Sequence, residues 1–203
     1  MKLAVFGGTF NPVHAGHLQV AENVLRAGLA ARVRFVPAHQ PPHKGGVGLA
    51  LGADRLEMLR RAVEGRAACE VSAIEIERAG PSYTADTLAA ISAENGGARL
   101  GFILGSDNFI QVGSWARFEA LLDLCEFLVV ERPGYPTVFP PPNVPSGLRA
   151  RLRHRPIPGP TLDVASSDLR RRLREGRDVS RWLPAPVLAY IRAHQLYATP
   201  NDA

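Results

Sequence analysis

The sequence of 203 residues has only two cysteines and no long apolar run. Cys69 and Cys125 lie far apart, which argues against a disulfide framework and against a zinc site. No segment approaches the roughly 18 uninterrupted apolar residues of a membrane helix, and the apolar start is too short for a signal peptide. We therefore expect a protein of the reducing cytoplasm with no membrane partner.

Two common nucleotide-binding fingerprints are missing as well. The turn GGTFNP at residues 7–12 is not G-x-G-x-x-G, and no G-K-[ST] follows it. An NAD-dependent dehydrogenase and a Walker-type ATPase are therefore disfavoured. The net charge of +5 indicates an anionic partner. Because no base-stacking aromatic series accompanies this charge, we expect phosphate-rich small molecules rather than nucleic acid.

Strands and helices alternate along the sequence. Apolar or alternating runs at 3–6, 32–38, 69–77, 99–105 and 125–134 are each followed by a helical pattern or a turn. This order predicts an α/β fold, a Rossmann-like doubly wound parallel sheet with helices on both faces. We expect one domain over 1–203, in which a C-terminal helical portion begins at about residue 166.

Local signals set the expected boundaries of these elements. Asp54 and either Ser166 or Ser167 are expected to cap helices, and Gly176 to end the second of these helices. The proline-crowded stretch from 133 to 160 predicts a surface excursion with room for one short helix.

The first loop carries two histidines at a helix start. His14 and His17 are three residues apart, so on a helical turn they face the same side, and Gly16 keeps the backbone open beside them. A helix N-terminus offers free N–H groups and partial positive charge, which together bind anions. The alternatives are a capping histidine with a core histidine, or a zinc site, although H-x-x-H lacks the further ligands of known zinc patterns.

An ordered set of motifs resembles a known family. GGTFNPVHAGHL at 7–18 is similar to the T/H-x-G-H motif of the nucleotidyltransferase superfamily, which class I aminoacyl-tRNA synthetases share. Within that superfamily the sequence resembles the bacterial nicotinate-nucleotide adenylyltransferases along nearly the whole chain. The segments that carry this resemblance are PPHK at 41–44, SYTADTL at 82–88, GSDNF at 105–109, Trp115, ERPG at 131–134 and SSDLR at 166–170.

The resemblance implies adenylyl transfer from ATP to nicotinate mononucleotide, which gives deamido-NAD and pyrophosphate in NAD biosynthesis. A phosphate monoester is mostly ionised at neutral pH, so the attacking phosphate needs no general base and no covalent enzyme nucleophile. The family implies that His17 contacts the α-phosphate and that His14 holds the ATP phosphates. Mg²⁺ is expected to accompany ATP, with no dedicated set of protein ligands.

The resemblance also assigns an ATP site, in which the C-terminal helical portion completes the pocket. Its expected residues are Gly7, Gly8, Thr9, Phe10, His14, His17, Gly105, Asp107, Arg132, Ser166, Ser167 and Arg170. The family pattern I-S-S-T-x-I-R is VASSDLR here, so Ala165 stands where the family has a serine. The further arginines between 171 and 177 are expected to form a solvated basic face.

Four residues are expected on the acceptor side. Trp115 would stack on the pyridinium ring through a cation–π contact, or it is simply a buried tryptophan in a helix. Tyr83 and Thr84 begin a helix, so their backbone N–H groups could receive the nicotinate carboxylate. Lys44 could reach the acceptor phosphate, or it is an ordinary exposed lysine.

Other functions stay open at the level of sequence. A sister adenylyltransferase would use nicotinamide mononucleotide or phosphopantetheine as its acceptor. A non-catalytic nucleotide- or RNA-binding module would use the basic helix at 170–177 instead. Association into a homo-oligomer is also left open.

Overall fold

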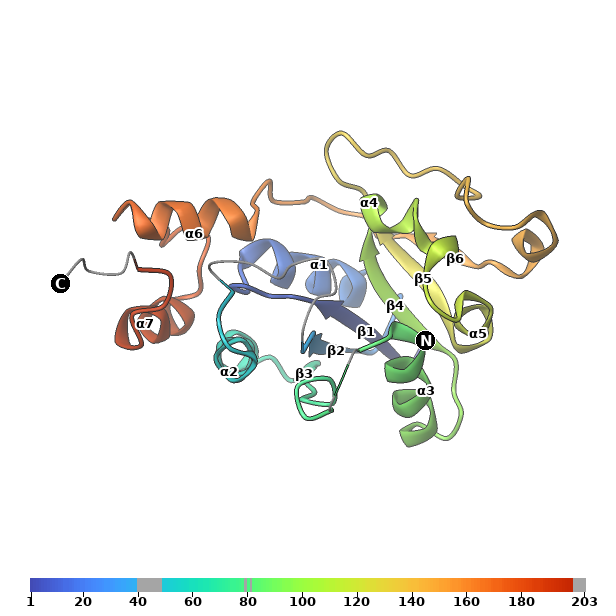
Figure 1. Cartoon of the computed structure of the whole chain (residues 1–203), viewed down its shortest axis with the longest axis horizontal. Coiled ribbons are helices and arrows are strands. Elements are labelled where there is room, and N and C mark those ends of the chain that lie inside the picture. Colours follow the sequence, from blue (N-terminus) through green and yellow to red (C-terminus); the bar gives the residue numbers. More distant parts are fainter. Residues whose placement is uncertain (40–48, 79, 81, 199–203) are drawn as a thin grey trace.

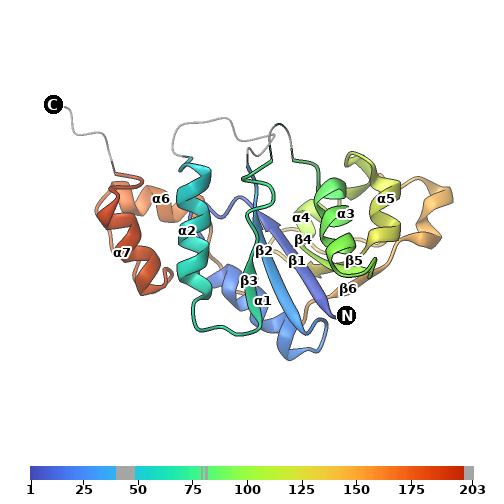
Figure 2. The ribbon, with the colours of Figure 1, turned by 90° about the horizontal axis from the view of Figure 1, so that it is seen from below.

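A single parallel sheet forms the centre of the computed structural model, which describes residues 1–39, 49–78, 80 and 82–198. The six strands lie in the order β3-β2-β1-β4-β5-β6, and every neighbouring pair is parallel (Figures 1 and 2). Their bounds are β1 Leu3–Gly8, β2 Arg32–Pro37, β3 Cys69–Val71, β4 Leu100–Gly105, β5 Cys125–Val130 and β6 His154–Pro156.

The strand order reverses between β1 and β4. The chain first adds β2 and β3 on one side of β1 and then places β4 on the other side. In such sheets the connections after the two neighbouring strands diverge, and a crevice opens at their carboxyl ends. The turn after β1 and the start of the helix after β4 therefore face the same crevice.

Helices cover both faces of the sheet (Figure 2). The helical segments are α1 Ala15–Arg26, α2 Gly52–Val63, α3 Thr84–Glu94, α4 Ser106–Phe109, α5 Phe118–Leu124, α6 Ser166–Arg174 and α7 Ala185–Ala193, with 3₁₀ turns η1 Val112–Ser114 and η2 Ser146–Arg151. Helices α1, α2, α6 and α7 share one hydrophobic cluster with the sheet, and α3 and α5 share the other. The expected doubly wound α/β fold is confirmed.

The side chains of β1 divide between these two clusters. Ala4 and Phe6 point into the cluster of α1 and α2, whereas Leu3 and Val5 point into the cluster of α3 and α5. This alternation follows from the two-residue period of a strand. Since a hydrophobic cluster covers each face of the sheet, the side chains of Leu3 to Phe6 are buried on both faces. The continuous apolar run in the sequence predicts this burial.

Several local expectations differ from the structure. The third strand is only Cys69–Val71, and the excursion at 133–160 contains, besides the short turn η2, a strand β6 that was not expected. Short strands such as β6 carry too little periodicity to be recognised, and here three residues gain order by pairing with β5.

The expected capping residues are also wrong, because their side chains bind elsewhere. Leu51 is the N-cap of α2, and the carboxylate of Asp54 accepts a hydrogen bond from the Tyr190 hydroxyl at 2.9 Å. Ala165 is the N-cap of α6, and the Ser166 hydroxyl donates to the Pro12 carbonyl at 3.0 Å. Gly176, at φ 64°, follows α6 as expected.

Among the described residues, no helix combines the length and the apolar character needed to cross a membrane.

Truncating a core aromatic should cost far more stability than truncating an exposed one. Phe127 on β5 is 0% exposed, whereas Phe139 in the excursion is 48% exposed. We expect Phe127→Ala to lower the free energy of unfolding by about 3–5 kcal/mol through lost burial and a residual cavity. Phe139→Ala is the matched control and should change it by less than about 1 kcal/mol. Urea unfolding measures both, and equal losses would contradict the assignment of the core.

Candidate active site

The two histidines of the first loop form a stacked pair at the start of α1. His14 is the N-cap residue and His17 lies in the first turn. Their ring centroids are 3.7 Å apart at an interplanar angle of 29°. The backbone N–H of His14 donates to Nδ1 of His17 at 3.3 Å, which fixes one ring against the helix end. The expectation that both imidazoles face the same side is therefore confirmed.

Gly16 is required by this packing. A Cβ at Gly16 would lie 2.9 Å from Cγ1 of Val164 and 3.1 Å from the ring of His14. Any side chain there would push the imidazole from its place or push away the segment that leads into α6. The glycine lets the histidine pair and the C-terminal part of the chain approach the same turn.

Both imidazoles are held in the neutral state. Burial, helped by the charge of Arg132, lowers the pKa of His14 from 6.5 to about 4. Burial also lowers the pKa of His17 well below its usual value, and His14 and Arg132 act in the same direction. Two protonated rings at this separation would repel each other strongly in a poorly solvated position. Near neutral pH the pair therefore presents uncharged rings to the crevice.

Two aromatic side chains pack against the His17 ring. The ring centroids of Phe10 and Phe6 lie 5.0 Å and 6.0 Å from that of His17, both in edge-to-face contact. Phe10 is 2% exposed and has a φ of 48°, so the turn after β1 directs its ring into the core. Phe10, one of the expected ATP residues, is therefore buried and packs against the His17 ring.

The ends of β4 and β5 contribute a charged pair. Arg132 Nε lies 3.4 Å from Oδ1 of Asp107. A Cβ at Gly105 would lie 2.3 Å from that carboxylate oxygen and 2.6 Å from the guanidinium nitrogen, so only glycine leaves room for the pair. The backbone N–H of Arg132 donates to the Ser106 hydroxyl, which in turn donates to the Tyr135 carbonyl. These bonds tie the two strand ends together.

Beside this pair lies a cavity of about 340 Å³. Its lining comes from the segment after β5 and from the chain that leads into α6, with the residues Glu131, Arg132, Pro133, Gly134, Pro136 and Thr161. The cavity is open to solvent and lies against one expected ATP residue, Arg132.

Helix α6 is bonded to the first loop. The Ser166 hydroxyl donates to the Pro12 carbonyl at 3.0 Å, and Nη1 of Arg170 donates to the Asn11 carbonyl at 2.8 Å. These bonds join residues that are 154 and 159 positions apart in the sequence. Ser167 lies exposed in the first turn of α6. Two expected ATP residues, Ser166 and Arg170, are thereby joined to the turn that follows Gly7 and Gly8 at the end of β1.

The acceptor candidates lie on the opposite face of the sheet. Tyr83 is the N-cap of α3 and Thr84 is its first residue. Trp115 is half-buried, follows η1 rather than lying within a helix, and meets the ring of Phe102 edge-on at 6.0 Å. The Phe102 ring in turn lies 3.4 Å from the position of a Cβ at Gly7. Lys44 lies outside the described residues.

Arg117 adds a positive charge to this acceptor side. Its guanidinium carbon lies 5.9 Å from the centre of the Tyr83 ring, and its side chain forms an ion pair with Asp86 in the first turn of α3. Arg117 lies outside the motifs that carry the family resemblance. Its sequence neighbour Trp115 was the only signal for this segment.

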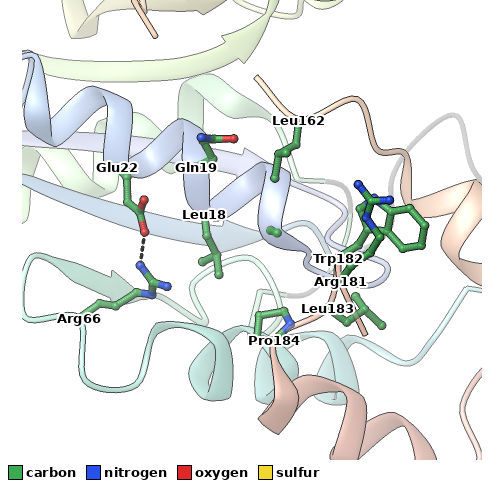
Figure 3. A pocket seen from close by; sticks show the side chains of 10 residues that line it. Leu18, Gln19, Glu22, Arg66, Leu162, Arg181, Trp182, Leu183 and Pro184 are labelled. Carbon is green, nitrogen blue, oxygen red and sulfur yellow. Dashed lines mark hydrogen bonds and ion pairs between the residues drawn. The ribbon is translucent and has the colours of Figure 1, made fainter. Parts of the chain in front are cut away.

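A larger cavity of about 410 Å³ lies along α1 (Figure 3). It runs between α1 and the segment joining α6 to α7, and it is lined by Ala15, Leu18, Gln19, Glu22, Arg66, Leu162, Arg181, Trp182, Leu183 and Pro184. Arg66 and Glu22 form an ion pair at its edge, and the cations of Arg172 and Arg181 both lie 4.8 Å from the Trp182 ring. None of the expected site residues lines this cavity.

Three residues around the first turn were not expected from the sequence. The side-chain oxygen of Asn11 accepts hydrogen bonds from the Ala50 N–H at 3.1 Å and from the Tyr197 hydroxyl at 2.6 Å. Nη1 of Arg55 donates to the Thr9 carbonyl at 2.9 Å. Asn11 stands inside the motif of the first loop and could have been suspected. Arg55 and Tyr197 have no such signal, because they reach the turn only through the tertiary fold.

Comparison with known proteins identifies the family to which this chain is related. The profile of the cytidylyltransferase-like family matches residues 5–172. A Pelobacter propionicus protein named probable nicotinate-nucleotide adenylyltransferase is 37% identical over 213 residues, covering 98% of this chain and 99% of that protein. A protein of the same name from Pseudomonas putida strain GB-1 is 40% identical, covering 98% and 96%.

Solved structures agree in fold. The nicotinic acid mononucleotide adenylyltransferase of Plasmodium falciparum in complex with NaAD superposes with a TM-score of 0.76 at 18% identity, covering 97% of each chain. The same enzyme in complex with APC gives a TM-score of 0.73, covering 97% of this chain and 96% of the other. From the curated relatives and the matching profile, the chain belongs to the nicotinate-nucleotide adenylyltransferase family of cytidylyltransferase-like proteins.

Proposed function

We propose that this chain transfers the adenylyl group of ATP to nicotinate mononucleotide and so makes deamido-NAD and pyrophosphate. The observation that carries this proposal is the neutral histidine pair at the N-terminus of α1, set at the switch point of the sheet with Arg132 nearby. The names of the curated relatives, which cover nearly the whole chain, support the same reaction.

The chemistry needs alignment and charge stabilisation rather than a base. An ionised oxygen of the nucleotide 5′-phosphate attacks the α-phosphorus of ATP, a new P–O bond forms, and the bond to the β-phosphate breaks. The electron pair leaves with pyrophosphate, so no proton has to be removed from the nucleophile. Negative charge grows on the α-phosphate and on the leaving group, where hydrogen-bond donors and cations lower the barrier.

His17 is proposed to donate to the α-phosphate. Its Nδ1 accepts the backbone N–H of His14, so the neutral ring carries its proton on Nε2, which remains a donor. His14 would hold the ATP phosphates beside it. The positive end of the α1 dipole adds to the same field, while the Ala15 N–H in the first turn is bonded to the Trp182 carbonyl at 2.7 Å.

The rest of the ATP site is proposed to run from the first turn to the ends of β4 and β5. Gly7, Gly8 and Thr9 would approach the phosphates through their backbone, with α6 above them. The cavity beside Arg132 is a candidate for the adenosine end. In this proposal the expected residues Gly105 and Asp107 set the position of Arg132, and Ser167 and Arg170 close the phosphate side.

The acceptor is proposed to lie across the sheet edge, against Trp115 and the start of α3. An N-terminus of an eleven-residue helix favours a carboxylate over a neutral carboxamide. Arg117 near Tyr83 adds to this preference. The pyridinium ring would then lie against Trp115, with its phosphate directed toward the histidine pair.

Mg²⁺ is proposed to arrive with ATP. Across the part of the chain that the structure describes, no group of three or more His, Cys, Asp or Glu side chains could hold a metal ion. Mg²⁺ is commonly bound through substrate phosphates, with few protein ligands, and this arrangement suits the site. When bound, it would neutralise charge on the departing pyrophosphate.

The choice of acceptor tests the proposed function directly. We expect pyrophosphate release with ATP, Mg²⁺ and nicotinate mononucleotide to exceed release with the amide by about tenfold or more, since one charge-assisted contact contributes about 1.5–3 kcal/mol. Phosphopantetheine serves as the control acceptor and should give background release. Equal rates with acid and amide would contradict the acceptor site at α3, and release only with phosphopantetheine would overturn the function.

Removing the proposed donor to the α-phosphate should abolish most of the rate. We expect His17→Ala to lower kcat by about 10²–10³-fold, as the loss of one preorganised donor usually does. The control is His194→Ala, which removes an exposed histidine at the end of α7. Circular dichroism confirms that both variants are folded. Near-normal turnover by folded His17→Ala would disprove the assigned role.

Stability should fall as the pH drops through the range in which the two rings resist protonation. Below about pH 6.5 the unfolded chain protonates both rings, while folded His14 stays neutral down to about pH 4. Above about pH 6.5 the neutral histidines therefore cost the folded state no stability. Below that pH the free energy of unfolding falls by about 1.4 kcal/mol per pH unit for each ring, and for His14 this continues down to about pH 4.

Urea unfolding at pH 7 and pH 5 measures this effect. We expect the loss of unfolding free energy between these pH values to be about 2 kcal/mol smaller in His14→Gln than in the unmodified chain. His194→Gln is the control and should keep the full pH dependence. An identical dependence in all three proteins would show that the pair is not held neutral.

A further inference from the structure

Arg55 is an arginine with no exposed surface at all, on α2 beneath the first turn. Its three guanidinium nitrogens donate to three backbone carbonyls. Nη1 bonds the Thr9 carbonyl at 2.9 Å, Nη2 bonds the His39 carbonyl at 2.9 Å, and Nε bonds the Ala50 carbonyl at 3.1 Å. Its neighbours on the helix, Arg60 and Arg61, are exposed.

These contacts are unusual for a buried charge. A buried cation is normally paired with a carboxylate, because removal from water costs several kcal/mol. The bonds found for Arg55 go to carbonyls only, and burial lowers the pKa of its guanidinium. An aliphatic residue would fill the same space without that cost. We therefore attribute the presence of arginine here to its planar guanidinium group, whose N–H donors can bond several backbone carbonyls at once.

The carbonyls that Arg55 joins belong to three separate segments. Thr9 follows β1 in the proposed phosphate turn, His39 follows β2, and Ala50 precedes α2. A single rigid guanidinium thus fixes the distances between the phosphate turn and the two other segments. Lysine carries its three donors on a single nitrogen and so could not reach three separated carbonyls as the three guanidinium nitrogens do.

A second link acts on the same segments from the C-terminal side. Asn11 accepts from the Ala50 N–H and from the Tyr197 hydroxyl, which is 186 positions away in the sequence. Burial raises the pKa of the Tyr197 hydroxyl well above its usual value, so it remains a donor at all working pH values. Ala50 is therefore held twice, through its carbonyl by Arg55 and through its N–H by Asn11.

We propose that Arg55 is a positioning residue for adenylyl transfer, which holds the turn at 9–11 in register with the histidine pair, and that Tyr197 supports it from the C-terminal segment. The inference rests on the proposed function. Thr9 is five residues before His14, and the turn sets where the phosphates lie relative to the His17 ring. A misplacement of about 1 Å far from the reacting atoms can cost 10²-fold in rate.

Chemical rescue provides a test that a purely structural role would not pass. Arg55→Ala leaves a cavity of the shape of a guanidinium ion, bordered by three carbonyls that lack a donor. We expect kcat to fall about 10–100-fold, with a smaller change in KM. Millimolar guanidinium chloride should restore at least part of kcat, while matched sodium chloride should not. Arg55→Lys should stay impaired, and Arg60→Ala, an exposed control on the same helix, should keep full activity.

The assay must separate positioning from stability. It is run at a temperature where circular dichroism shows every variant fully folded, with and without guanidinium. Wild-type kcat in folded Arg55→Ala, or a loss that guanidinium leaves unchanged, overturns the proposal. If Arg55→Ala does not fold, Tyr197→Phe decides, since it removes one hydroxyl: a several-fold fall in kcat supports the proposal and an unchanged kcat overturns it. No turnover by the unmodified chain would instead refute the proposed function.

Discussion

Two imidazole rings are stacked at the start of α1 with their centroids 3.7 Å apart, and burial of the pair keeps both rings uncharged near neutral pH. Much of the surrounding structure serves that requirement. Phe6 and Phe10 support one ring with their edges, Gly16 leaves room for the other, and the charge of Arg132 opposes protonation of both. The result is a pair of neutral donors in a positive field, an arrangement suited to polyanionic substrates.

The first turn is held by bonds from remote parts of the chain. Arg55 reaches it across 46 positions, Arg170 across 159 and Tyr197 across 186. Because the turn at 9–13 is irregular backbone outside any helix or strand, these long-range bonds determine its shape. The C-terminal part of the chain therefore helps to shape the site, through the hydrogen bonds of Arg170 and Tyr197. It also packs on the sheet, because Leu169, Val187 and Ile191 belong to the same hydrophobic cluster as Ala4 and Phe6 of β1.

The switch point explains how two substrates can meet. The histidine pair and α6 lie on the face of α1, whereas Trp115 and the start of α3 lie on the opposite face. The Phe102 ring touches the position of a Cβ at Gly7, so the two groups of residues are separated by one strand and its glycines. A ligand that crosses the carboxyl ends of β1 and β4 would contact both, as the proposed reaction requires.

The alternation of buried strands and helices and the histidine pair could be predicted from the sequence, because these depend on local periodicity and on residues close in the chain. Which polar groups meet depends on how the chain folds. Asp54 and Ser166 look like helix caps, yet they bind Tyr190 and Pro12. Arg55 resembles its solvated neighbours on α2 but is buried under a turn 46 positions away. Spacing cannot reveal such contacts, since they arise when the sheet brings remote segments to one edge.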